Sequence, residues 1–393
     1  MATSALTLAV ATATALLLSP SVRRRASAAL AVSSRGASTA TASALTGILY
    51  RYKAPQWPAP LQAFESPINH RHERYCIYVG GLTDGLLACK YVDQLAGALD
   101  LCGWALVQPV LTSSYTGYGC SSLSRDAEEL SRLISHIDER DGAAGRPAKA
   151  FAIVGHSTGC QDAVTLLSSA PLAVRIKLRA AVLQAPVSDR EAASLDPDPE
   201  GRASTLARAE ALVAAGRGAS LLPDDLHNGM PAARSPLSRG DALRGPAFDV
   251  RALSGFVPIS AARYASLAGA LGPDDMFSSD LSDEELRTRL GHMGTTGQRE
   301  GIRGTDADQW LVEPLPEHPG LRTCFAHAGA DEYVPRAVDV DTLSRRFIAA
   351  AGGRPNGAEA VIIRDGNHNL ATPPAAAGEF VEVVCRVLKD AVP

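Results

Sequence analysis

Short runs of mainly apolar residues alternate with amphipathic segments along much of the chain. The runs are typical of strands buried in a sheet, and they lie at residues 47–52, 75–79, 104–107, 150–154 and 180–183. The later runs are separated by segments with apolar residues three or four positions apart, which predicts helices over residues 92–102, 123–137 and 160–169. This alternation predicts an α/β fold, with a mostly parallel sheet and helices on both of its faces.

The alternation stops near residue 190. Residues 190–320 are rich in charge, proline and glycine, and they show helical pieces but no clear strand. One helix is predicted over residues 203–215, and a second after Ser282, which forms a capping box with Glu285. An insertion at this point lies above the carboxyl ends of the parallel strands, where such sheets bind ligands. We therefore interpret residues 190–320 as a helical cap.

The strand pattern resumes at residues 323–326 and 360–363, and an amphipathic helix follows the second run. Strands of one sheet are thus expected on both sides of the insertion. We predict a single α/β domain over residues 46–393, interrupted by the cap.

The pentapeptide Gly155-His156-Ser157-Thr158-Gly159 lies where a predicted strand meets a predicted helix. A serine in such a sharp turn has its hydroxyl exposed above the sheet, and the flanking glycines avoid collisions with neighbouring backbone. We therefore predict that Ser157 is a catalytic nucleophile. The alternative is a glycine-rich turn that only caps a helix.

A serine nucleophile requires a base, and the base requires a third group that orients it. In this kind of fold the partners follow the serine in the order acid, then histidine. His368 comes directly after the last predicted strand, so we predict that it is the base. Asp331 follows the preceding strand and is the predicted acid, with Glu332 beside it and Asp189 after an earlier strand as alternatives.

The reaction also requires backbone donors for the developing oxyanion. One donor is expected at Thr158, the residue after the nucleophile. The other is expected in the loop after the strand at residues 75–79, where Gly81 allows a close approach of the backbone. Leu82 is the predicted donor in that loop, with Thr83 as the alternative.

Three further residues near these loops invite interpretation. Ser114 and Tyr115 follow a strand on the same edge of the sheet as Ser157, so they are candidates for substrate contact. The alternative for these two residues is a plain polar loop. Gly81 is a further candidate for substrate contact. His156 precedes the nucleophile, and we expect it to point away from the site and to pack in the core.

Composition excludes several classes of function. A formal net charge of −4 provides no basic surface for nucleic acid. The seven cysteines form no C-x-x-C pair, which favours free thiols in a reducing compartment. The chain has no H-E-x-x-H and no G-x-G-x-x-G motif opening its first helix, so we predict no metal and no nucleotide cofactor.

The amino-terminal segment resembles a targeting peptide. The first 64 residues contain no acidic residue, and residues 1–45 are rich in alanine, serine and threonine, with only arginines as charged side chains. This composition favours a plastid transit peptide, with a mitochondrial or cytoplasmic location as alternatives. The apolar run at residues 6–18 lacks a preceding positive charge and is too short to form a stable membrane span.

From residue 47 to its end the chain resembles the α/β-hydrolase superfamily. More narrowly, it is similar to a largely uncharacterised family of fungal and plant proteins that includes fungal siderophore esterases. The blocks that carry this resemblance are residues 80–86, 155–162, 188–191, 275–284, 331–335 and 368–369. The resemblance implies the α/β-hydrolase fold and a serine hydrolase with Ser157, Asp331 and His368 as its triad.

We therefore expect a serine hydrolase that cleaves a small-molecule carboxylic ester through an acyl-enzyme. Thioester hydrolysis or acyl transfer would use the same residues. A protein of this fold that binds a ligand without catalysis is the alternative from a different class. The sequence leaves the oligomeric state and the substrate open.

Overall fold

The computed structural model describes residues 44–53, 60–67, 72–195, 198–222, 258–293, 320–352 and 357–392. Nearly all of the predicted leader, residues 1–45, lies outside this set. Residues Met1–Ala44 and Leu45–Pro393 form two separate units, and the description below concerns the second. Among the described residues, no helix combines the length and apolar character that a membrane crossing requires.

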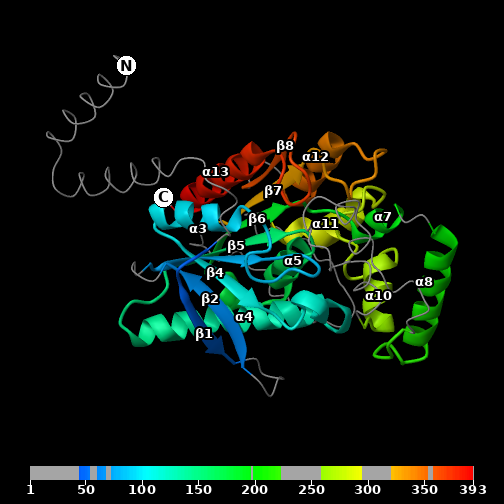
Figure 1. Ribbon diagram of the computed structural model, residues 1–393, viewed down its shortest axis with the longest axis horizontal. Helices are drawn as coiled ribbons and strands as arrows, with labels where there is room; N and C mark the ends of the chain where they lie inside the picture. The colour runs from blue at the N-terminus through cyan, green and yellow to red at the C-terminus, as the bar shows by residue number, and fades with distance from the viewer. Residues whose placement is uncertain are drawn as a thin grey trace, which may run out of the picture. The chain divides into compact units, whose positions relative to one another are not determined.

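Eight strands form one sheet in the order β1-β2-β4-β3-β5-β6-β7-β8 (Figure 1). In chain order they are β1 Ile48–Tyr52, β2 Leu61–Ser66, β3 Arg74–Val79, β4 Ala105–Val110, β5 Ala150–His156, β6 Leu178–Gln184, β7 Arg322–Ala328 and β8 Ala358–Ile363. Strand β2 pairs antiparallel with β1 and β4, and the other neighbours are parallel. The predicted mostly parallel sheet is confirmed. Strand β2 was not predicted, because polar Gln62 and Glu65 interrupt its short apolar pattern.

The helices that cover the sheet divide between its two faces. One face carries α4 Leu123–Ala143, α5 Gly159–Ser169, α6 Leu172–Arg175 and α12 Val340–Ala350, and the other carries α3 Val92–Leu101 and α13 Pro374–Ala391. Side chains of β5 show how both cores are filled. Phe151 and Ile153 pack with α4 and α5, whereas Ala152 and Val154 pack with α3 and α13, because successive strand residues point to opposite sides.

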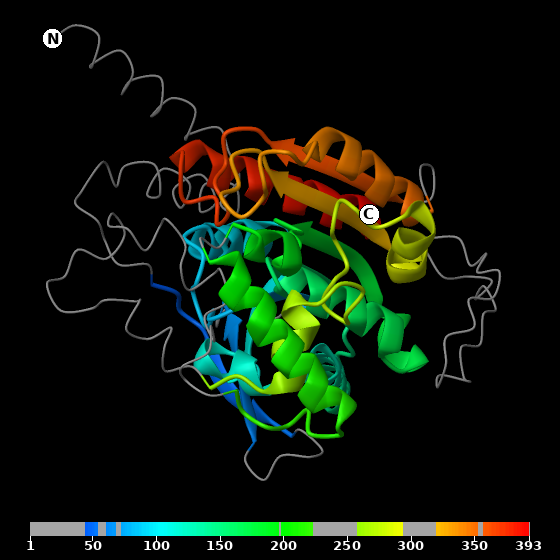
Figure 2. The same ribbon diagram turned by 90° about the vertical axis from the view of Figure 1, so that its right-hand side faces the viewer.

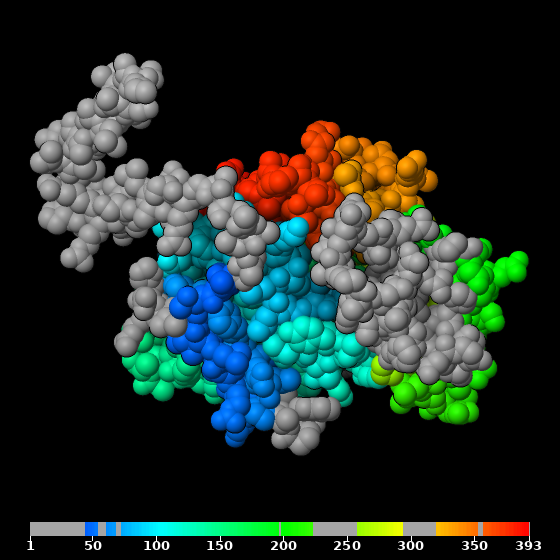
Figure 3. Space-filling model, viewed as in Figure 1, coloured from blue at the N-terminus to red at the C-terminus, as the bar shows by residue number. Residues whose placement is uncertain are grey.

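Helices α3 and α13 lie side by side although they come from opposite ends of the chain (Figure 1). In the space-filling view, red atoms near the C-terminus lie directly against cyan atoms of the first half of the chain (Figure 3). Both helices contribute to the same buried core, in which Leu95 and Phe380 are fully buried. The two halves of the domain are therefore joined by one continuous core on this face.

The central strands β3 and β5 leave a crevice at their carboxyl ends. They are parallel neighbours, but the helix after β3, α3, covers one face and the helix after β5, α5, covers the other. The two connecting loops therefore diverge. A ligand site is expected where such loops separate, and both the predicted nucleophile and the predicted oxyanion loop follow these strands.

Between β6 and β7 the described residues form helices and no strand of the sheet, as predicted. These elements are α7 Asp189–Ala193, α8 Pro199–Ala214, α10 Ala261–Ala268, α11 Asp283–Leu290 and the 3₁₀ helix η4 Gly291–Met293. The capping box at the start of α11 is confirmed, since Ser282 and Glu285 each accept a hydrogen bond from the other's backbone amide.

The insertion is not one uniform layer. Helices α8 and α10 share a small core of their own with Tyr118 and Leu222, and Figure 2 shows α8 nearest the viewer on this side of the molecule. By contrast, Leu286 and Leu290 of α11 pack into the main core. The cap interpretation therefore remains a prediction for α7, α8 and α10, while α11 is part of the domain body.

Candidate active site

Ser157 occupies a strained turn between β5 and α5. Its φ of +53° lies in the left-handed region, which a side chain rarely adopts. The flanking glycines have no space for a side chain: a Cβ on Gly155 would lie 2.3 Å from the carbonyl oxygen of Gly159. A Cβ on Gly159 would lie 2.3 Å from the carbonyl oxygen of Val79 on the neighbouring strand. Strain at one residue, maintained by two glycines, is typical of a catalytic serine.

His368 and Asp331 are brought together by the loops that follow β8 and β7. Nδ1 of His368 lies 2.9 Å and 2.8 Å from the two carboxylate oxygens of Asp331. The Asp331 side chain is 2% exposed, and its Oδ1 also accepts a hydrogen bond of 3.0 Å from the amide of Tyr333. Because Asp331 accepts, Nδ1 carries a proton and Nε2 of His368 is free to act as a base.

Burial and charge act in opposite directions on the imidazole of His368. Burial lowers the pKa of His368. The charge of Asp331 and its hydrogen bond, together with the charges of Glu332 and Asp84, raise the pKa by more than burial lowers it. The net pKa lies above the ordinary value for histidine. The imidazolium form is thus stabilised, as a general base requires once it has taken a proton.

The two alternative acids have other partners. Oε2 of Glu332 accepts a hydrogen bond of 2.9 Å from the backbone amide of His368 and so holds the loop rather than the ring. Oδ2 of Asp189 accepts a hydrogen bond of 2.9 Å from the side-chain amide of Gln161. Of the three candidates, the structure places Asp331 against the imidazole.

The loop after β3 lies directly against Ser157. A Cβ on Gly81 would lie 2.7 Å from the Cβ of Ser157, so only glycine fits there. The Gly81 amide donates a hydrogen bond of 2.8 Å to Oδ2 of Asp84 and is therefore not free for an oxyanion. Among the described residues, the amides of Leu82 and Thr158 have no hydrogen-bond partner in the chain.

Ser157 and His368 line one cavity of about 150 Å³. Leu82 lines it from the loop after β3, and Asp189 and Ala192 line it from α7. A site of this size, with a serine, a histidine and free backbone donors at its wall, has the components of acyl transfer chemistry.

Ser114 and Tyr115 lie outside the residues that line this cavity. Oγ of Ser114 accepts a hydrogen bond of 2.9 Å from the Leu111 amide and stabilises its own turn. The Tyr115 ring packs so closely against Gly85 that a Cβ on this glycine would lie 2.0 Å from the ring. Both residues thus support neighbouring loops. Ser114 also lines a neighbouring cavity together with Leu82 and Thr158, and the substrate contact stays a prediction.

Gln184, at the end of β6, is a residue of the site that the sequence analysis did not select. It is fully buried, and its Nε2 donates a hydrogen bond of 2.8 Å to the carbonyl oxygen of His368. Its Oε1 lies 2.5 Å from Nδ1 of His156 and accepts a hydrogen bond of 3.2 Å from the hydroxyl of Tyr91. Gln184 therefore links the histidine loop to the residue that precedes the nucleophile.

His156 is buried, as expected, but it does not point away from the site. It lines the same cavity as Ser157, and its ring centroid lies 5.0 Å from that of His368. The ring of Tyr333 packs edge-on against His368 at 4.5 Å. The imidazole of His368 is thus held between two rings, which restricts its rotation.

Comparison with known protein families shows to which family this chain belongs. Residues 38–389 match the family described as "Protein of unknown function (DUF1749)", which is most of the chain. The chain belongs to the DUF1749 family.

Relatives of this DUF1749 protein include proteins with assigned activities. Fusarinine C esterase sidJ of Aspergillus fumigatus is 32% identical over 333 residues, which span 77% of this chain and 82% of that protein. Esterase AN6793 of Emericella nidulans is 29% identical over 334 residues, or 76% and 80% of the two chains. The solved structure of siderophore hydrolase EstB from Aspergillus fumigatus is 27% identical and covers 89% of this chain and 98% of its own, with a TM-score of 0.64. The α/β-hydrolase fold is confirmed.

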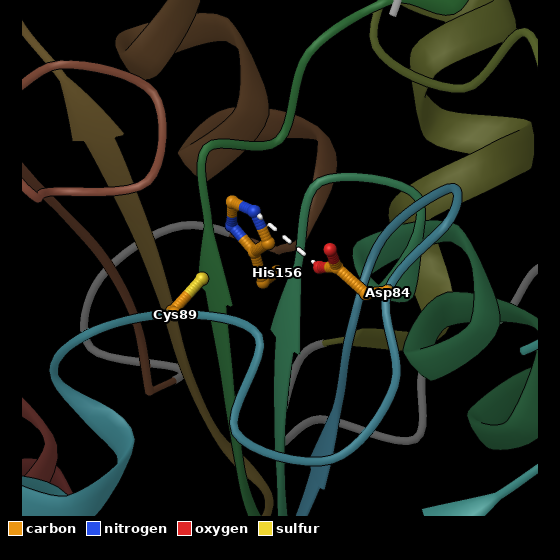
Figure 4. Close-up of side chains that lie close together, drawn as sticks. All are labelled: Asp84, Cys89 and His156. Carbon is orange, nitrogen blue, oxygen red and sulfur yellow. Dashed lines mark ion pairs between the residues drawn. The ribbon is translucent and has the colours of Figure 1, made fainter. Parts of the chain in front are cut away.

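One group of side chains in this DUF1749 protein has the composition of a metal site. Asp84, Cys89 and His156 each place one potential ligand atom within 4.8 Å of the others, and they are the only such group among the described residues (Figure 4). The sequence analysis predicted no metal because the chain has no H-E-x-x-H motif. Asp84 and Cys89 lie in one loop, whereas His156 lies at the end of a different strand. No sequence spacing could reveal this group.

Proposed function

We propose that this protein is a serine hydrolase that cleaves a carboxylic ester through Ser157, His368 and Asp331. The observation that carries the proposal is the pairing of His368 Nδ1 with Asp331 at 2.8 Å beside the same cavity as the strained Ser157. The relatives named as esterases and the structure named as a siderophore hydrolase support an ester as the substrate.

Acylation begins at the hydroxyl of Ser157. Its oxygen attacks the ester carbonyl carbon while its proton passes to Nε2 of His368. The imidazolium that forms is stabilised by Asp331, which also keeps the ring in the tautomer that accepts at Nε2. The negative charge moves to the carbonyl oxygen, where the amides of Leu82 and Thr158 stabilise it.

Collapse of this intermediate breaks the bond to the alcohol. His368 returns the proton to the leaving oxygen, the alcohol departs, and the acyl group remains on Ser157. A water molecule then attacks the acyl-enzyme with His368 again as base, which releases the acid and restores the serine. Thioester hydrolysis and acyl transfer differ only in the leaving group or the acceptor.

Labelling with a fluorophosphonate tests the nucleophile. The wild-type protein is expected to form a covalent adduct, which mass spectrometry locates on Ser157. The Ser157→Ala variant should remain unlabelled, and Ser169→Ala, which removes an exposed serine on α5, should label normally. A wild-type protein that folds but stays unlabelled would identify a ligand-binding protein instead of an enzyme.

A substrate panel then defines the reaction. The purified protein is offered p-nitrophenyl esters of increasing acyl length, the matching thioesters, and fusarinine C, which one relative's name gives as its substrate. We expect hydrolysis of oxygen esters, with a chain-length limit set by the cavity of about 150 Å³. Preferential turnover of thioesters, or a product acylated on an added alcohol, would replace ester hydrolysis with the corresponding alternative.

A further inference from the structure

A mixed group of potential metal ligands borders the cavity next to the nucleophile. Figure 4 shows Asp84 and Cys89 from the loop after β3 and His156 from the end of β5, with all three side chains pointing toward one another. Oδ2 of Asp84 lies 3.8 Å from Nε2 of His156. The Cys89 sulfur lies within 4.8 Å of a ring nitrogen of His156 and of a carboxylate oxygen of Asp84. We call these three residues the DCH cluster.

The chemistry of the DCH cluster suits a borderline-soft divalent cation. Thiolate, imidazole and carboxylate are the three side-chain ligands of zinc, and three protein ligands with a fourth open position are a common arrangement. Cys89 and His156 are 3% and 4% exposed. A buried thiol or a buried histidine alone is usually only a packed side chain, so the argument depends on how the histidine is oriented.

Gln184 fixes that orientation. Its Nε2 donates to the carbonyl oxygen of His368, so its Oε1 must face Nδ1 of His156 and accept from it. Nδ1 therefore carries a proton, and in the neutral ring the lone pair lies on Nε2, which lies 3.8 Å from Oδ2 of Asp84. Histidine ligands of metals are held in this way, with the other ring nitrogen donating to a fixed acceptor.

The DCH cluster is accessible and close to tetrahedral dimensions. All three residues line the cavity of about 150 Å³, which gives an ion and a water molecule a route to the site. In a tetrahedral zinc site, bonds of about 2.0 Å to nitrogen and oxygen and about 2.3 Å to sulfur place ligand atoms roughly 3.3 to 3.6 Å apart. Oδ2 of Asp84 and Nε2 of His156, now 3.8 Å apart, must approach each other by a few tenths of an ångström. The Cys89 sulfur must move by at most about 1.5 Å, which a loop residue can do.

We propose that Asp84, Cys89 and His156 bind Zn²⁺, and that the bound ion inhibits the hydrolase. Cys89 releases its thiol proton to solvent as the bond from sulfur to zinc forms, and water from the cavity takes the fourth position. Binding itself does not depend on the function proposed above, whereas inhibition does.

Inhibition follows from two contacts of the DCH cluster. Oδ2 of Asp84 holds the Gly81 amide at 2.8 Å, so an ion that draws this oxygen away disturbs the loop that carries Leu82. The ring of His156 lies 5.0 Å from that of His368. A divalent cation at this position disfavours the imidazolium that forms when His368 takes a proton.

Cadmium binding tests the site without reference to activity. The full-length protein with Cys102→Ser and Cys120→Ser, which removes the two exposed thiols, is titrated with Cd²⁺ and the ultraviolet charge-transfer band of cadmium thiolate is recorded. We expect a band that saturates at one ion per chain and that Zn²⁺ displaces. Adding Cys89→Ser or, separately, Cys89→Ala should abolish the band, while adding Ser157→Ala should leave it unchanged. The absence of a band in the parent, or its persistence without Cys89, would overturn the proposal.

Inhibition by Zn²⁺ is measured on ester hydrolysis in the same proteins. Loss of Cys89 should raise the Zn²⁺ concentration for half inhibition by roughly 100-fold, since removing a ligand costs at least as much as removing one of its supports. Equal inhibition with and without Cys89 would show that the inhibiting ion binds elsewhere and would refute regulation through the DCH cluster. If the protein hydrolyses no ester, the cadmium titration still decides whether the site exists.

Discussion

Two adjacent acidic residues in the loop after β7 act on different parts of one histidine. Asp331 contacts the ring of His368 through Nδ1, and Glu332 contacts its backbone amide. The first contact changes the charge and tautomer of the base. The second only holds the loop in place. Neighbouring carboxylates that look equivalent in the sequence therefore carry separable roles.

Isosteric amides at these two positions separate the roles. Asp331→Asn should lower kcat by roughly 10⁴-fold, because the amide neither stabilises the imidazolium nor selects the correct tautomer. Glu332→Gln should lower kcat by less than about tenfold, because the amide oxygen still accepts from the His368 backbone. Steady-state hydrolysis of one ester by both variants provides the comparison. Equal losses of kcat in the two variants would show that the contact between Asp331 and the His368 ring has no special role.

The pH dependence of hydrolysis reports the pKa of His368. His368 must be neutral to accept a proton, so activity rises with pH through its pKa, which is raised above its ordinary value chiefly by Asp331 acting against burial. The acid limb of kcat/KM should therefore lie above about pH 6.5. In Asp331→Asn the limb of the residual activity should move to lower pH. A limb that stays in place would show that another group controls it.

Chain order and strand ends led the sequence analysis to select Ser157, Asp331 and His368, and the structure pairs Asp331 with His368 beside a cavity that Ser157 also lines. The sequence analysis did not identify Gln184, whose hydrogen bond to His368 spans 184 positions and exists only because β6 lies between the nucleophile strand and the acid strand. For the same reason the sequence could not show that Asp84 and Cys89 lie close to His156. Residues that support others leave no local pattern, since their partners are set by tertiary packing.

At the level of elements, a buried arginine joins the insertion to the body of the domain. Arg263 of α10 is 4% exposed, and its guanidinium donates to Asp274 at 2.7 Å and to the carbonyl oxygen of Tyr118 at 3.1 Å. The charge of Arg263 also acts on two buried carboxyl groups of the domain body. Burial raises the pKa of Asp126 in α4 to about 7 despite this cation. Burial likewise raises the pKa of Asp162 in α5 well above its usual range. One cation thus serves several buried carboxyl groups.

Replacing this arginine should destabilise the protein in a pH-dependent way. Arg263→Met leaves Asp274 without its partner, which typically costs about 3 to 5 kcal/mol in the free energy of unfolding. We expect this cost at pH 8.5 and a smaller one at pH 5.5, because Asp126, with its raised pKa, is protonated there and needs no cation. Urea unfolding at both pH values measures the difference, with Arg322→Met at an exposed position as the control. A pH-independent loss would mean that only packing was removed.

At the scale of the whole molecule, periodicity predicted the parallel strands and the edge strand β1, but it missed β2, which lies between β1 and β4. Strands β3 to β8 are apolar runs between helices, and such runs are read directly from the sequence. Strand β2 alternates imperfectly and is held by pairing with β1 and β4, so its position depends on partners rather than on its own pattern. The sequence predicted helices between β6 and β7, and helices are found there, but it did not predict that α11 packs into the main core.

The leader remains a prediction, and it concerns where the whole molecule acts. Its acid-free composition favours import into a plastid, and the family match begins only at residue 38. Strand β1 starts at Ile48, and residues Leu45–Pro393 form a unit of their own. The chain without residues 1–44 should therefore fold and hydrolyse esters at a rate within about twofold of the full-length protein. Fused to a fluorescent protein and expressed in plant cells, residues 1–45 should direct it to plastids. Accumulation in mitochondria or in the cytoplasm would select the corresponding alternative, and a loss of activity on truncation would show that the segment takes part in the fold.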